Sequence, residues 1–143
     1  MLFSRRVAVC LLFFLMLCAH AQAPQTIQLT VDYNDGVQKR FTLAFTPGMT
    51  VFDAMTAAKA KSHGLTFDCD PKFPCSGSPA NRLLSIIDDV KNQGGGSSAR
   101  NWVFWVNGIS ADKGFGACKL APDDKVLWKF DTYRGETPGK ACR

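Results

Sequence analysis

The sequence predicts an α+β fold in which one helix packs across one face of a mixed β-sheet. Apolar residues recur at every second position in three segments, 27–33, 41–45 and 126–130, as expected for strands with one buried face. An amphipathic helical segment starts after Thr50, between the second and the last of these strands. A hairpin followed by a helix and more strands is the wiring of a β-grasp, and other α+β rolls share this element order.

The first two strands are expected to pair as an antiparallel hairpin. They are separated by Asn34, Asp35 and Gly36, and the Asp-Gly pair favours a tight turn between strands. Pro47 and Gly48 then end the second strand.

The helix has recognisable start and stop signals. Thr50 is a favourable N-cap, and Asp53 at the third helical position can reach back to it and favours the positive end of the helix dipole. Val51 and Met55 share one apolar face. Gly64 is predicted to end the helix.

The second half of the domain contains one ambiguous segment and one clear strand. The apolar spacing of 83–90 fits one face of a helix, which the pattern slightly favours, but it also fits a short β-branched strand. The segment 102–106 is apolar on both faces and is predicted to be a central strand, followed by a turn at Asn107 and Gly108.

The first 21 residues are predicted to be a cleavable signal peptide. Arg5 and Arg6 precede an uninterrupted apolar run, Val7–Leu17, and small residues follow at Ala19 and Ala21. The apolar run has 11 residues, whereas a helix that spans a membrane needs ~20. Cleavage is expected after Ala21, so the protein is predicted to be secreted and extracellular, or periplasmic in a Gram-negative bacterium.

The mature chain is expected to hold one domain, 22–131, and a polar C-terminal tail, 132–143. Loss of Arg5 and Arg6 leaves 15 basic and 12 acidic residues, and the net charge of +3 is spread without runs. Such a distribution does not indicate a nucleic-acid partner, and no further stretch is long and apolar enough to span a membrane. The expected partner is therefore a protein or a small-molecule ligand.

Four cysteines remain after removal of the signal peptide: Cys69, Cys75, Cys118 and Cys142. An even number in a small exported domain predicts two disulfides, for which three pairings exist. We expect Cys118 to pair with Cys142, because the tail after the last strand is long enough to return, and Cys69 to pair with Cys75 across a short loop. A metal site is not expected, because the Cys69–Cys75 spacing is wider than in zinc knuckles and the mature chain has one histidine, His63.

Four residues are candidates for ligand contact: Trp105, Asn107, Gly108 and Phe115. Trp105 lies on the opposite strand face from Trp102 and Phe104, and a β-grasp sheet has one face without a helix. Asn107 and Gly108 form either a ligand loop or simply a turn. Phe115 lies between two glycines, where it either forms an exposed binding edge or plugs the end of the barrel. Trp128 alternates with apolar neighbours and is predicted to belong to the core.

The sequence shows no recognisable catalytic constellation, and we expect a protein that is not an enzyme. His63 stands at the expected helix end, where it can satisfy terminal carbonyls, and no serine or cysteine has a nucleophile setting. The carboxylate pairs at 88–89 and 123–124 are adjacent in sequence, so their side chains are expected to point to opposite faces of a strand.

Three motifs carry a family resemblance: TVFDAM at 50–55, NWVFWVNG at 101–108 and DDKVLWKF at 123–130. They resemble the DUF4430 family, which is related to the C-terminal domain of transcobalamin and intrinsic factor, over about residues 27–130. The resemblance implies a β-grasp-like fold and a strand at 85–90, which we adopt as our prediction. Asp89 and Asp123 stand where the family often has glycine, and the four cysteines lie outside the motifs.

The resemblance implies an exported, non-catalytic binding module for a corrinoid or another small ligand. No bound cofactor is expected, and cobalamin enters only as a candidate ligand. The chain has no room for the helical barrel that completes the cobalamin site of the vertebrate carriers. The alternatives are an extracellular protein–protein interaction or surface domain and, least favoured, a small secreted hydrolase.

Overall fold

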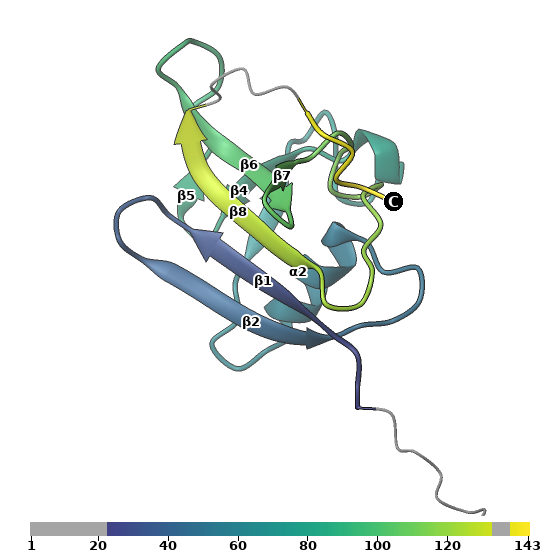
Figure 1. Ribbon diagram of the computed structural model, residues 1–143. Helices are drawn as coiled ribbons and strands as arrows, with labels where there is room; N and C mark the ends of the chain where they lie inside the picture. The colour runs from purple at the N-terminus through teal and green to yellow at the C-terminus, as the bar shows by residue number, and fades with distance from the viewer. Residues whose placement is uncertain (1–22, 133–137) are drawn as a thin grey trace, which may run out of the picture.

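The two alternating segments near the N-terminus form the predicted antiparallel hairpin, β1 (Thr26–Asp32) and β2 (Gln38–Ala44). The computed structural model describes residues 23–132 and 138–143 (Figure 1). The predicted signal peptide, 1–21, lies outside the described residues, as does part of the predicted tail, 132–143.

The hairpin belongs to a five-stranded mixed sheet in the order β2-β1-β8-β6-β7 (Figure 1). The first strand, β1, runs parallel to the last, β8 (Lys125–Thr132), while β6 (Arg100–Val106) and β7 (Ile109–Ser110) are antiparallel to their neighbours. The predicted central strand at 102–106 is β6, which has β8 on one side and the short β7 on the other and lies second from the edge. Its outward-facing Val103 and Trp105 are apolar because they line a cleft.

A second, three-stranded antiparallel sheet contains the segment that the pattern left ambiguous. It consists of β3 (Phe67–Cys69), β4 (Leu84–Ile87) and β5 (Val90–Lys91). The strand predicted at 85–90 is confirmed in part, because the segment forms a tight hairpin in which Ile87 pairs with Val90 and Asp88, in the turn, has a φ of 49°. The helical reading arose because Leu84 and Ile87, three positions apart, are both buried.

The helix α2 (Val51–Lys59) begins as predicted. Thr50 and Asp53 form a capping box, in which the Asp53 N–H donates to Thr50 Oγ1 at 3.2 Å and the Thr50 N–H donates to Asp53 Oδ2 at 2.9 Å. The helix ends at Lys59, earlier than the predicted stop at Gly64. Gly64 instead allows the chain to pass close to the end of the helix, because a Cβ there would lie 2.4 Å from the carbonyl oxygen of Ala58. A short 3-10 helix, η2 (Pro79–Asn81), precedes β4.

The core lies between the five-stranded sheet and the elements that cover one of its faces. The sheet contributes alternate residues of β1, β6 and β8, and the helix contributes Ala54, Met55 and other buried residues of its inner face. Trp128 is 2% exposed, so the prediction that it belongs to the core is confirmed. It stacks on Phe104, with ring centroids 4.7 Å apart.

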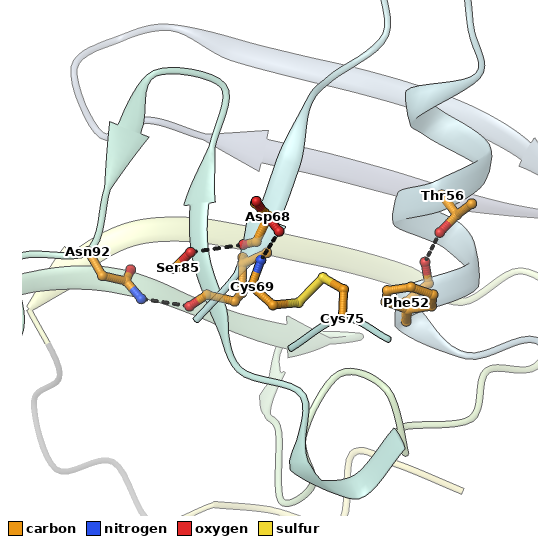
Figure 2. The surroundings of a disulfide bond; sticks show 8 residues. Phe52, Thr56, Asp68, Cys69, Cys75, Ser85 and Asn92 are labelled. Atoms are coloured by element: carbon orange, nitrogen blue, oxygen red, sulfur yellow. Dashed lines mark hydrogen bonds between the residues drawn. A yellow bond between two sulfur atoms is a disulfide. The ribbon is translucent and has the colours of Figure 1, made fainter. Parts of the chain in front are cut away.

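Both predicted disulfides are present, Cys69–Cys75 and Cys118–Cys142. Figure 2 shows the first beside β3 and β4, where Ser85 Oγ donates to the Asp68 carbonyl at 3.1 Å. The second bond returns the C-terminal residues to β7, where the Gly139 N–H donates to the Ser110 carbonyl at 3.2 Å.

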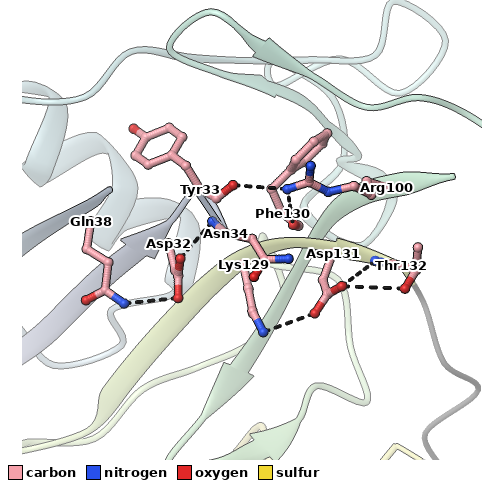
Figure 3. A network of polar contacts seen from close by, with 9 residues as sticks. All are labelled: Asp32, Tyr33, Asn34, Gln38, Arg100, Lys129, Phe130, Asp131 and Thr132. Carbon is pink, nitrogen blue, oxygen red and sulfur yellow. Dashed lines mark hydrogen bonds and ion pairs between the residues drawn. The ribbon is translucent and has the colours of Figure 1, made fainter. Parts of the chain in front are cut away.

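Arg100 connects the ends of β1 and β8 to the start of β6 (Figure 3). Its guanidinium donates to the carbonyls of Tyr33 at 3.1 Å and Phe130 at 3.2 Å, and it lies over the Phe130 ring. Nearby, Lys129 and Asp131 form an ion pair at 3.0 Å. These contacts fix the relative positions of the three strands.

Asp88, in the β4–β5 turn, joins the two sheets. Its carboxylate accepts hydrogen bonds from Tyr33 Oη, from Lys39 Nζ at 3.0 Å and from the Thr66 N–H at 2.8 Å. Burial alone would raise the pKa of Asp88, but the hydrogen bonds from Tyr33, Thr66 and Lys39 outweigh it and hold the pKa below its ordinary value. Burial, and then the hydrogen bond to Asp88, raise the pKa of Tyr33 well above its ordinary value.

Candidate ligand-binding site

A cleft of about 580 Å³ opens at the edge of the five-stranded sheet, beside β6. Its walls come from β6 and β8, from the loop after β7 and from the residues around the start of β4. The opening follows from the shortness of β7, which pairs with β6 only at Trp105 and Val106. Within residues 23–132 and 138–143, the edge of β6 at Trp102 and Val103 therefore has no neighbouring strand.

Aromatic rings form the inner wall of the cleft. Phe104, Phe115 and Trp128 all line it, and each is less than a tenth exposed. The Phe115 ring meets the Trp128 ring edge-on at 5.7 Å. Leu83, which is 50% exposed, adds an apolar side chain to the same wall. Such a surface favours flat or apolar groups.

Two buried donors in the walls have no acceptor. Among residues 23–132 and 138–143, three buried side-chain nitrogens lack a hydrogen-bond partner, and two of them, Trp128 Nε1 and Arg82 Nε, belong to residues that line this cleft. A buried donor without a partner costs ~1–3 kcal/mol. An acceptor supplied by a ligand would recover that free energy.

The charge of the walls is positive. Arg82, Lys113 and Lys129 line the cleft together with one carboxylate, Asp131, which pairs with Lys129. Arg82 lies over the Phe52 ring, with its guanidinium carbon 4.0 Å from the centroid, and it makes no ion pair in the described part of the chain. The excess of positive charge favours an anionic ligand.

Three of the four predicted contact residues line this cleft: Trp105, Gly108 and Phe115. Trp105 is half-buried on the sheet face that carries no helix. Phe115 is 2% exposed, so its side chain is buried and does not form an exposed binding edge. Its ring nevertheless forms part of the cleft wall.

Asn107, the fourth predicted residue, does not line this cleft; its side chain holds the chain in place. Asn107 and Gly108 both have positive φ, 53° and 80°, as a two-residue hairpin turn requires. Asn107 Nδ2 donates to Asp124 Oδ1 at 2.8 Å, and its Oδ1 accepts from the Lys125 N–H at 2.9 Å. Both turn residues also border a shallower depression over β1 and β8.

Sequence reasoning missed Arg82 and the donor role of Trp128. Arg82 follows η2 in a stretch without periodicity, so no local pattern marks it. Its place depends on Gly116, where a Cβ would lie 2.9 Å from Arg82 Cδ. The two glycines around Phe115 were the available signal that another chain segment approaches this loop closely.

The described ranges hold no group of three or more His, Cys, Asp or Glu side chains that could bind a metal ion. His63 is exposed, with a φ of 56°, beyond the end of α2. Within those ranges no helix has the length and apolarity to cross a membrane.

The fold and the cleft define a class of protein, a small disulfide-bonded α+β domain with an aromatic-walled cleft at the edge of its sheet. The chain matches the DUF4430 family, a domain of unknown function, over residues 48–132, and it belongs to this family. The match includes all three motifs of the resemblance and every wall of the cleft, and it begins after the β1–β2 hairpin. No curated protein matches the sequence.

Proposed function

We propose that this protein is an exported, non-catalytic binding module whose ligand occupies the cleft beside β6. The observation that carries the proposal is the pair of buried donors, Trp128 Nε1 and Arg82 Nε, in the walls of an aromatic cleft. Buried donors are nearly always paired in folded proteins, so two in one cleft favour an acceptor that arrives with a ligand.

Export is supported by the cysteines and by the N-terminal sequence. All four cysteines of the described chain are paired in disulfides, which persist in oxidising compartments. N-terminal sequencing of protein recovered from the culture medium or periplasm should begin at Gln22. Protein that stays in the cytosol with residues 1–21 attached would contradict the export part of the proposal.

The strand order supports a β-grasp-like fold and a relationship to the transcobalamin C-terminal domain. The hairpin, the helix and the parallel pair β1–β8 follow β-grasp wiring. A corrinoid is then one candidate ligand. A cleft open to solvent covers one side of a large flat ring, so we expect cobalamin to bind the monomer with a dissociation constant on the order of micromolar or weaker.

The test is a titration of the ¹⁵N-labelled mature protein with aquocobalamin and, separately, with the apolar anionic dye anilinonaphthalene sulfonate. Ligands in the cleft should shift the indole N–H signal of Trp128. The amide signals of β2 serve as the internal control, because no residue of this strand lines the cleft. Binding that shifts only residues of β1 and β2 would contradict the assignment of the cleft.

A second candidate function is a protein–protein interaction domain. Leu83 and Ile109 are large apolar residues with about half of their surface exposed, and they lie on the segments that flank the cleft. A partner protein would cover both. Loss of the interaction in an Ile109→Ser variant, with small-ligand binding unchanged, would favour this function over the first, because Ile109 does not line the cleft.

A further inference from the structure

The free edge of β6 presents one unpaired donor and one unpaired acceptor of the main chain. On this edge the Trp102 N–H donates to Asn92 Oδ1 at 2.8 Å, and the Phe104 carbonyl accepts from the Ala111 N–H at 3.2 Å. In the described ranges nothing bonds to the Trp102 carbonyl or to the Phe104 N–H. Both residues line the cleft.

This pair of groups matches one residue of an extended chain. In a parallel strand pair, one residue donates its N–H to residue i−1 of the neighbour and accepts from the N–H of residue i+1. A guest residue opposite Val103 would therefore bond to the Trp102 carbonyl and the Phe104 N–H together. Addition of a peptide to an open strand edge is a common mode of recognition.

Beyond the Phe104 N–H the edge of β6 is already paired, so a guest chain must end or turn away there. Past Phe104 the edge is occupied, first by Ala111 and then by β7. The loop that follows carries Lys113 and packs against the backbone of η2 and Arg82. Lys113 Nζ lies 3.4 Å from the Arg143 main-chain oxygen, whereas Arg82 has no carboxylate partner in the described part of the chain. An anionic chain end fits at this position.

We propose that the cleft binds the C-terminal residue of a peptide, held by parallel strand addition to β6 at Val103 and by Arg82 at its carboxylate. The inference rests on the proposed function, because it names the ligand class of the same cleft. The peptide N–H donates to the Trp102 carbonyl, and one carboxylate oxygen accepts from the Phe104 N–H. The guest side chain then lies on the sheet face of Val103, where Val103 and Trp105 favour an apolar or aromatic side chain.

Three acetylated tripeptides test the proposal by calorimetry and by ¹H–¹⁵N spectra of the mature protein. The first is acetyl-Ala-Ala-Phe with a free carboxylate, the second is its C-terminal amide, and the third carries an N-methyl group on Phe. We expect the acid to bind, and the amide and the N-methyl peptide to bind at least about tenfold more weakly, since each loses one charge-assisted or main-chain hydrogen bond. The acid should shift the amide signal of Phe104.

A substitution of Arg82 is tested with the same acid and amide peptides, so that protein and peptide are each changed at one partner of the expected ion pair. Arg82→Gln should lose most of the preference for the acid over the amide, because the guanidinium that pairs with the carboxylate is gone. Lys91→Gln removes an exposed cation of β5 and should bind both as the unmodified protein does. Melting curves show whether Arg82→Gln is folded. If this variant does not fold, the comparison of acid with amide on the unmodified protein still shows whether the cleft recognises a C-terminal carboxylate.

The outcomes separate this inference from the proposed function. Equal binding of acid and amide, or binding without a shift of Phe104, would overturn the peptide proposal. If no peptide binds while the anilinonaphthalene dye shifts the Trp128 indole, the cleft remains a ligand site and the peptide proposal is wrong. If neither the peptides nor the dye shift the Trp128 indole signal, both the peptide proposal and the proposed ligand site are wrong.

Discussion

Replacement of Asp88 by Asn should destabilise the domain far more than the same change at its neighbour, Asp89. Asp88 Oδ2 accepts from Tyr33 Oη and Lys39 Nζ, and Oδ1 accepts from Thr66. An Asn side chain keeps one accepting oxygen, which can serve Thr66, and places an amide nitrogen against the other two donors. Asp89 is exposed and provides the matched control.

The magnitude follows from the two contacts that are lost. Tyr33 is 8% exposed, and a buried hydroxyl without its acceptor costs ~1–3 kcal/mol. The Lys39 ion pair is partly exposed, with side-chain exposures of 37% and 23%, so it contributes at most about 1 kcal/mol. We expect a loss of about 2–3 kcal/mol and a fall in Tm of about 10 °C.

The effect should also depend on pH. The pKa of Asp88 is lowered in the folded state, so its contribution is present above the ordinary pKa of an aspartate, ~3.9, and is lost as the pH falls through the folded value. The stability difference between the native protein and Asp88→Asn should therefore shrink below about pH 4.

Urea unfolding followed by tryptophan fluorescence at several pH values measures this difference. Asp89→Asn, measured in parallel, accounts for the loss of one negative charge at this turn. Equal losses in the two variants, or a difference for Asp88→Asn that stays constant from pH 7 to pH 3, would refute the role assigned to Asp88.

Further predictions concern the tryptophans, the disulfides and Tyr33. Trp128→Ala should lower stability by ~3–5 kcal/mol and Trp105→Ala by much less; equal falls in Tm would mean that Trp105 is a core residue. Replacing the Cys118–Cys142 pair by alanine should cost ~3.5 kcal/mol and replacing Cys69–Cys75 ~2.4, because the first closes the longer loop, and urea midpoints in the opposite order would contradict this. The raised pKa of Tyr33 means that its stabilising contribution is present below ~pH 10 and is lost above its folded pKa. Tyrosinate absorbance should therefore be the same in the native protein and Tyr33→Phe up to about pH 11, and an early difference would show that the hydroxyl is not protected.

The fold was predictable where local pattern and burial agree. The alternation in β1 and β8 reports one buried face, and the capping box at Thr50 and Asp53 marks the start of α2. Local pattern failed where a role depends on how the chain folds back after an element. The helix ends at Lys59 and the chain then turns, so that Gly64 lies against the carbonyl of Ala58 at the helix end.

The structure explains how an aspartate is accommodated at position 123, one of the departures from the family pattern. Asp123, which stands where the family often has glycine, has a φ of 66°, in the region that favours glycine. Asp124 beside it is 4% exposed and accepts from the Ala121 N–H at 2.7 Å and from Asn107. This carboxylate pair, expected on opposite faces of a strand, instead lies in the turn before β8, where Asp124 holds the start of that strand in place.

The candidate site was predictable only in part, because a cleft is a property of the assembled sheet edge. Trp105 could be singled out because its strand face is known from alternation. Arg82 could not, because its position depends on contacts with Gly116 and Phe52, which are distant in sequence. The open groups of Trp102 and Phe104 exist because β7 is short, and strand length is among the least certain features of a sequence prediction.

The parallel pairing of the first and last strands constrains when this chain can fold. Gln28 lies beside Lys125 and Asp32 beside Lys129, so β1 finds this neighbour only after nearly the whole chain has been synthesised. Contacts between such distant positions close slowly, because a long loop must be ordered before they form. The two parts of the five-stranded sheet, β2-β1 and β6-β7, are joined through β8, so the complete sheet forms only after the C-terminal part of the chain emerges. The export that we propose for this protein would require such a delay, because a chain crosses a narrow secretion channel before it folds.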